Sequence, residues 1–89
     1  MNTTNKIRER RQVIYNVLKQ NLPIKMNASG IAREINRLKI FQYPVSASQV
    51  SYAIRDYVLR SKCFSVFFQG KRVLYSVYKQ KTPYNAWSE

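Results

Sequence analysis

The spacing of apolar residues changes at Cys63, and this change sets the class of fold. Upstream of Cys63, apolar residues recur every three or four positions, as they do in helices with one buried side. Downstream, the stretches CFSVFF and VLYSVY are rich in β-branched and aromatic residues, and Gly70 in the QGK between them suits a tight turn. A chain of 89 residues has room for one hydrophobic core. The pattern therefore predicts one α+β domain in which helices precede a β-hairpin.

The first expected helix is the stretch TTNKIRERRQVIYNVLKQN. It ends before Pro23, because the residue preceding a proline is disfavoured in the α region. Three apolar residues share one side of it, namely Ile14, Val17 and Leu18. Arg10 and Arg11 interrupt the apolar stripe upstream, so we expect the first turns to extend beyond the core. The cluster of Arg8, Arg10 and Arg11 is expected to be solvated.

Two further helices follow a short extended piece. Residues 24–26, IKM, are too few to form a sheet alone and are expected to pair with a strand downstream. Asn27 is a suitable N-cap for a helix over ASGIAREINRLK. Ser46 and Gln49 form a capping box at the start of the third helix, in which each residue's side chain bonds the other's backbone N–H. Apolar residues recur along this helix at helical spacing: Ala47, Val50, Ile54, Tyr57 and Val58.

The hairpin has one expected register. If Gln69 and Gly70 are the two turn residues, Val66 pairs with Val73 and Phe64 with Tyr75. One face is then expected to pack on the helices: Phe64, Val66, Val73, Tyr75 and Val77. Another set falls on the opposite face: Phe67, Leu74 and Tyr78.

The C-terminal stretch KQKTPYNAWSE shows no periodicity. We therefore expect a domain over residues 1–78 followed by an irregular tail over residues 79–89, which could project as an arm. Within this tail, Trp87 is a candidate contact with a second copy or a larger protein.

The order and spacing of these segments resemble a winged helix-turn-helix domain. ASGIAREI resembles the usual second helix, and VSASQVSYAIRDYVLRSKCF resembles the recognition helix leading into the first wing strand. QGKRVLYSVYK resembles the wing tip and return strand of many bacterial regulators, including the ArsR-type repressors. The resemblance covers about residues 5–78 and implies three helices, a short strand and a C-terminal β-hairpin wing.

Two departures limit what the resemblance implies. Metal sensing by ArsR-type proteins needs thiolate or imidazole ligands, whereas this chain has no His and one Cys. We therefore expect no metal site. The first wing strand contains Ser65, Val66, Phe67 and Phe68, where many family members carry charged residues. An apolar wing favours contact with a protein partner or stacking on bases.

The resemblance also implies a DNA-contacting surface on helix 46–60 and the wing tip, residues 69–72. In the family, the recognition helix enters the major groove and the wing touches an adjacent groove or the backbone. Eight positions of this chain are the candidates: Arg33, Arg37, Ser48, Ser51, Tyr52, Arg55, Lys71 and Arg72. Arginine can bond guanine through two hydrogen bonds, and Ser or Tyr can donate to phosphates or base edges. Two alternatives stay open: Tyr52 as a surface aromatic packed on a neighbour, and Gln49 as a cap only.

The charge balance also favours a polyanionic partner. Sixteen Lys and Arg residues face four Asp and Glu residues, a formal net charge of +12. An enzyme is not expected, because there is no His, no phosphate-binding loop and few carboxylates. No cofactor is expected. No apolar run is long enough to cross a bilayer, no helix is left over to lie on a membrane, and the N-terminus lacks the apolar region of a signal peptide. With a lone Cys63, these features predict a cytoplasmic protein.

Two functions follow as hypotheses. The first is a small regulator that contacts duplex DNA, as a homodimer joined by the first helix or by Trp87. The second is an accessory subunit of a replication or recombination enzyme of a mobile element. In that case the basic surface holds single-stranded nucleic acid and the apolar wing docks on the enzyme.

Overall fold

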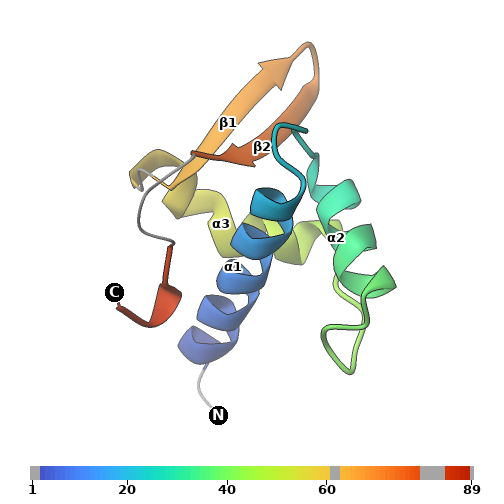
Figure 1. Cartoon of the computed structure of the whole chain (residues 1–89), viewed down its shortest axis with the longest axis vertical. Helices are drawn as coiled ribbons and strands as arrows, with labels where there is room; N and C mark the ends of the chain where they lie inside the picture. Colours follow the sequence, from blue (N-terminus) through green and yellow to red (C-terminus); the bar gives the residue numbers. More distant parts are fainter. Residues whose placement is uncertain (1–2, 61–62, 79–83, 89) are drawn as a thin grey trace.

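A computed structural model describes residues 3–60, 63–78 and 84–88, excepting the side chains of residues 3–5, 56–60 and 88. The elements in chain order are α1 (Thr3–Gln20), α2 (Ala28–Arg37), α3 (Ala47–Arg60), β1 (Phe64–Gln69), β2 (Arg72–Val77) and the short 3-10 helix η1 (Ala86–Ser88). The three helices pack together, and the hairpin lies across one end of them (Figure 1). This arrangement confirms the predicted α+β class. In the part of the chain that is described, no helix is both long and apolar enough for a membrane crossing.

The core forms where the apolar sides of the three helices meet. Each helix contributes a pair of residues four positions apart, which lie on one side of a helix because 3.6 residues make a turn. These pairs are fully buried: Ile14 with Leu18, Ile31 with Ile35, and Val50 with Ile54. The expected apolar sides of the helices are confirmed at these positions. The side chains of Tyr57 and Val58, which were expected to continue the third stripe, lie outside the described residues.

The expectation that Arg11 is solvated is wrong. Arg11 is 9% exposed, and its Nε donates a hydrogen bond of 3.0 Å to the carbonyl oxygen of Ala53 in α3. Ile7, one turn earlier, packs against the core as a partly buried residue. The first turns of α1 are therefore held against α3, because a long side chain can bury its stem while its charged end finds an acceptor.

Helix α2 begins where the sequence predicts and ends two residues earlier. The side chain of Asn27 accepts a hydrogen bond of 2.7 Å from the N–H of Gly30, which confirms it as the N-cap. Lys39 adopts a positive φ of 52° and cannot continue a right-handed helix. The N–H groups of Lys39 and Ile40 bond back to the carbonyls of Asn36 and Ile35, so α2 closes with the bonds of a Schellman motif.

The predicted register of the hairpin is wrong, because the two-residue turn lies one position further along the chain than expected. The turn consists of Gly70 and Lys71, so Gln69 pairs with Arg72 and Val66 with Tyr75. Gly70 has a positive φ of 62° at the first turn position, which glycine adopts without steric cost and which a type II′ turn requires. Each partner on β2 moves by two positions. The predicted faces are kept because side chains alternate along a strand, and Phe64 and Val77 are buried as expected.

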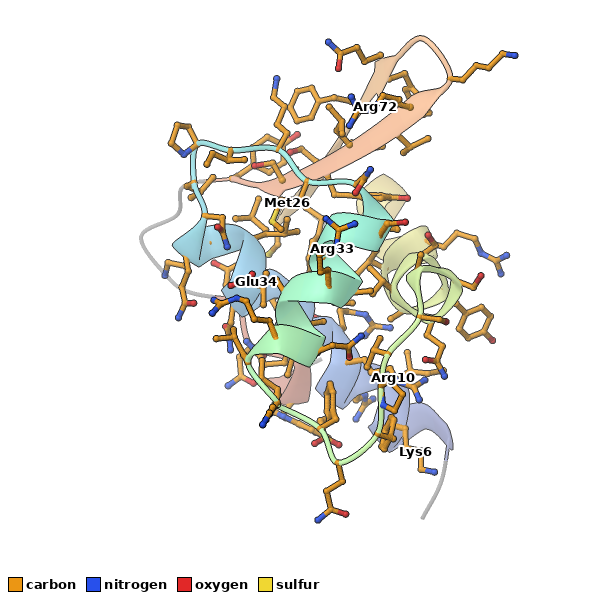
Figure 2. The ribbon with its side chains drawn as sticks, turned by 90° about the vertical axis from the view of Figure 1, so that its right-hand side faces the viewer. Lys6, Arg10, Met26, Arg33, Glu34 and Arg72 are labelled. Atoms are coloured by element: carbon orange, nitrogen blue, oxygen red, sulfur yellow. The ribbon has the colours of Figure 1, made fainter. Side chains whose placement is uncertain are left out.

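The expected third strand is reduced to one bridge. Met26 and Tyr75 exchange two backbone hydrogen bonds, of 2.9 Å from the Met26 N–H and 2.7 Å from the Tyr75 N–H. Strand β2 therefore lies between Met26 and β1. This pair of bonds fastens the connection between α1 and α2 to the hairpin (Figure 2).

The C-terminal residues 84–88 pack against α1. They therefore do not project as an arm, which was one possibility for the tail. Tyr84 and Ala86 are part of the hydrophobic core. The side-chain amide of Gln12 holds this segment: Nε2 donates to the carbonyl oxygen of Tyr84 at 3.0 Å, and Oε1 accepts from the N–H of Ala86 at 2.7 Å. Trp87 stays 53% exposed.

Candidate nucleic-acid interface

The start of α3 is fixed by the predicted capping box. The N–H of Ser46 donates to Oε1 of Gln49 at 3.0 Å, and the N–H of Gln49 donates to Oγ of Ser46 at 3.2 Å. Two backbone donors that the first helical turn leaves without partners are satisfied in this way. The assignment of Gln49 as a cap is confirmed.

A hydrogen-bonded clamp that sequence patterns did not reveal joins α2 to the start of α3. The side-chain amide of Asn36 makes two bonds to Val45: Nδ2 donates to its carbonyl at 3.0 Å, and Oδ1 accepts from its N–H at 2.8 Å. Asn36 lies on the polar side of α2, where helical spacing gives no sign of a partner nine residues away. The clamp fixes the direction in which α3 leaves the connecting loop.

We expect Asn36→Ala to destabilise the fold by about 1–3 kcal/mol, because both backbone groups of Val45 lose their partner. Urea denaturation followed by circular dichroism measures the change. Asn16→Ala is the control, because the Asn16 side chain is exposed on α1 and its Oδ1 accepts a solvent-exposed hydrogen bond of 3.2 Å from Nε2 of Gln12. Equal stability of Asn36→Ala and the parent chain would contradict the role of the clamp.

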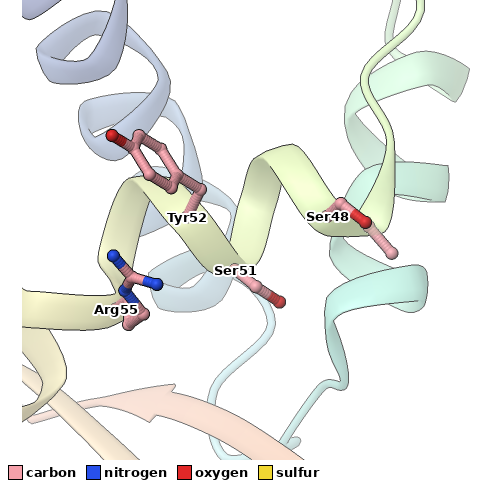
Figure 3. Close-up of a pocket in the computed structure, with 5 residues that line it drawn as sticks. Ser48, Ser51, Tyr52 and Arg55 are labelled. Carbon is pink, nitrogen blue, oxygen red and sulfur yellow. The ribbon is translucent and has the colours of Figure 1, made fainter.

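Four of the predicted residues share the outward side of α3. Together with Ala47 they line an open hollow of about 370 Å³ (Figure 3), and these four are Ser48, Ser51, Tyr52 and Arg55. Tyr52 is 58% exposed, and the Arg55 guanidinium carbon lies 5.4 Å from the centre of its ring. Tyr52 therefore presents a solvent-exposed aromatic ring beside the positive charge of Arg55 on the same helix.

The other four predicted residues lie apart from this hollow. Arg33 is exposed on α2, and Figure 2 shows it on the outer side of that helix, below the hairpin that carries Arg72. Lys71 and Arg72 are exposed at the hairpin turn. Arg37 is engaged with Glu34: Nε donates to Oε2 at 3.1 Å, and Nη2 bonds Oε1.

The ion pair between Arg37 and Glu34 is accessible to water. The hydrogen bond from Arg37 holds the pKa of Glu34 below its ordinary value, and the bond to Glu34 raises the pKa of Arg37. Because an exposed pair of this kind contributes little to stability, a phosphate can compete for the guanidinium. Arg37 is thus a weaker candidate contact than Arg33 or Arg55, because its charge is already paired with that of Glu34.

A second basic and aromatic cluster lies where the loop before α3 meets the start of α1. The rings of Phe41 and Tyr43 are stacked at 5.6 Å and 16°, and the guanidinium carbon of Arg10 lies 5.8 Å from the Tyr43 ring centre. Lys6 and Glu9 line an adjoining hollow of about 360 Å³. The only sequence signal for this cluster is the pair of aromatic residues in IFQYPV.

Comparisons of the sequence with protein-family models and curated proteins, and of the structure with solved structures, find no match. Among the described residues, no three His, Cys, Asp or Glu side chains are grouped closely enough to hold a metal ion. The surface chemistry of α3, the loop before it and the hairpin is therefore the basis for a functional proposal.

Proposed function

We propose that the chain is a non-enzymatic, winged helix-turn-helix-like DNA-binding protein that contacts duplex DNA through α3 and the hairpin turn. One observation carries the proposal. The outward side of α3 carries polar and basic residues and no acidic one: Ser48, Ser51, Tyr52 and Arg55. The opposite side of the same helix is fully buried at Val50 and Ile54. A helix held in this way presents fixed side chains to a groove.

The chemistry of this side suits the edges of base pairs. The major groove is about 12 Å wide and admits a helix. Arg55 can donate two hydrogen bonds to a guanine, and the hydroxyls of Ser48, Ser51 and Tyr52 can donate to base edges or phosphate oxygens. The capping box and the Asn36 clamp support this role, because they fix the start of α3 relative to α2.

The hairpin turn supplies a second contact in this proposal. Lys71 and Arg72 are exposed beside Gly70, and no acidic residue occurs from Phe64 to Val77. A turn of this composition can approach the phosphate backbone or a narrow minor groove. The net charge of +12 supports the same class of partner.

The test is the affinity for a duplex selected from a random pool, measured by fluorescence anisotropy. We expect Arg55→Gln to weaken binding to the selected duplex about 10-fold and to an unselected duplex less, because loss of a bidentate base contact costs about 1–3 kcal/mol. Arg55→Lys is expected to behave similarly, since lysine lacks the planar fork.

Lys19→Gln is the matched control for this experiment. It also removes one positive charge, from the last turn of α1 beside Leu22 and Pro23, and it is expected to change affinity less than 3-fold. Equal losses for Arg55→Gln and Lys19→Gln on both duplexes would show that the chain binds DNA by charge alone, against the proposed role of α3.

Exposed aromatic rings favour a second candidate, a single-strand-binding accessory subunit. Among the side chains that the structure describes, large aromatic residues with more than two fifths of their surface exposed occur at four places besides Tyr52: Tyr43, Phe68, Tyr78 and Trp87. Unpaired bases stack on such rings without sequence preference. Tighter binding to a single strand than to the matching duplex in the same assay would favour this candidate over the first.

A further inference from the structure

Phe68 is the most exposed large apolar side chain in the described part of the chain. It is 75% exposed, whereas Phe67 beside it is 37% exposed. Phe67 is also covered on one side, because the Lys25 ammonium lies 3.9 Å from its ring centre. The Phe68 ring contributes little to the core, so most of its surface is available to a ligand.

The pleat of β1 defines the side from which Phe68 projects. Phe64 is buried in the core, and side chains four positions apart on a strand lie on the same side. Val66, between them, is partly buried. Phe68 therefore projects from the same side of the hairpin as Phe64, near the turn, where the hairpin extends beyond the helices (Figure 1).

The charges around Phe68 favour a polyanion as the occupant. Lys71 and Arg72 are exposed within four residues of it, and the hairpin from Phe64 to Val77 contains no Asp or Glu. Lys71 lies in the turn beyond Phe68, and Arg72 pairs with Gln69 and so projects from the other side of the hairpin. An apolar ring close to a basic turn is complementary to DNA, in which apolar base faces lie between two lines of phosphates. A second copy of the chain would bring the same positive charges to the contact.

We infer that Phe68 is a wedge that inserts between base pairs of duplex DNA and kinks it, while Lys71 and Arg72 contact the flanking phosphates. This inference rests on the proposed function and adds a mode of contact to it. Apolar side chains that partly unstack a base step bend DNA by about 20–90°. Steps of a pyrimidine followed by a purine unstack most easily, so TpA is the expected site.

The experiment uses two 30-bp duplexes with a fluorescent donor and acceptor at their ends. One carries a central TpA step in a G·C-rich context, and the other carries ApT at the same place. Anisotropy reports binding of the full chain, and energy transfer between the ends reports bending. We expect the parent chain to increase energy transfer on the TpA duplex more than on the ApT duplex.

Phe68→Ala is expected to abolish the increase in energy transfer and to weaken binding to the TpA duplex about 5- to 150-fold, the range typical of a lost aromatic stacking contact. Phe67→Ala is the matched control on the neighbouring position and opposite side of the same strand, and it is expected to bind and bend like the parent. Thermal unfolding of both variants checks that they are folded, as the exposure of Phe68 predicts.

Three outcomes would overturn the inference. The first is binding of the parent chain without bending, which leaves the proposed function standing. The second is undiminished bending by Phe68→Ala. The third is unchanged DNA binding by Phe68→Ala together with loss of self-association in sedimentation, which would assign Phe68 to a contact between copies. Absence of any duplex binding by the parent would instead contradict the proposed function itself.

Discussion

Replacing Tyr84 with alanine is expected to lower the free energy of unfolding by about 3–5 kcal/mol, the usual cost of truncating a buried aromatic residue. Tyr84 is 9% exposed, and its ring centre lies 5.2 Å from that of Tyr15 and 5.5 Å from that of Phe64. Tyr15 and Phe64 are themselves in edge contact at 5.9 Å. The three rings join α1, β1 and the C-terminal segment, so truncation of one leaves a cavity at this junction.

Urea denaturation of Tyr84→Ala measures this effect, and Trp87→Ala is its control. Trp87 follows three residues later and is half exposed, so its truncation is expected to cost about 1 kcal/mol or less. A loss below 1 kcal/mol in Tyr84→Ala would show that the C-terminal segment contributes little to the core. A loss near the expected range would mean that truncation after residue 78 removes part of the core.

The affinity for duplex DNA is expected to fall about 500-fold between 50 and 200 mM salt, if about five phosphates are neutralised. The slope arises because each contact with a lysine or arginine releases condensed counterions. Arg33 and Arg55 on the helices and Lys71 and Arg72 at the turn are exposed cations available for such contacts. Anisotropy titrations on one unselected duplex at several salt concentrations give the slope.

A double variant, Lys71→Gln with Arg72→Gln, tests which cations produce the slope. Each lost phosphate contact should reduce the slope of log affinity against log salt by about 0.9. Lys19→Gln is expected to leave the slope unchanged. If the double variant also leaves the slope unchanged, the hairpin turn does not contact phosphates. A slope near zero for the parent chain would rule out an electrostatic DNA interface.

The four residues on α3 were predicted together because helical spacing alone places them on one side. Ser48, Ser51, Tyr52 and Arg55 do line one hollow. The cluster of Arg10 with Tyr43 was not predicted, because its partners come from α1 and from an irregular loop that has no period. The engagement of Arg37 was open to prediction, since Glu34 precedes it by three residues on one helix.

The sequence by itself determined the elements whose signals are local. The cap at Asn27, the box of Ser46 with Gln49, and the apolar pairs four residues apart all depend on neighbours within one or two turns. The positive φ of Gly70 is local too, although the sequence pattern wrongly places Gln69 in the turn. Such features form wherever the chain has these residues, so periodicity and capping patterns predict them.

Only the tertiary structure decided which polar residues are buried and where the chain end packs. Arg11 bonds a carbonyl 42 positions away, and Gln12 bonds backbone groups 72 and 74 positions away. In an isolated helix, Arg11 and Gln12 would be solvated like their polar neighbours. Their acceptors and donors come within reach only when α3 and the C-terminal segment pack on α1, because hydrogen bonds require contact in space and leave no period in the sequence.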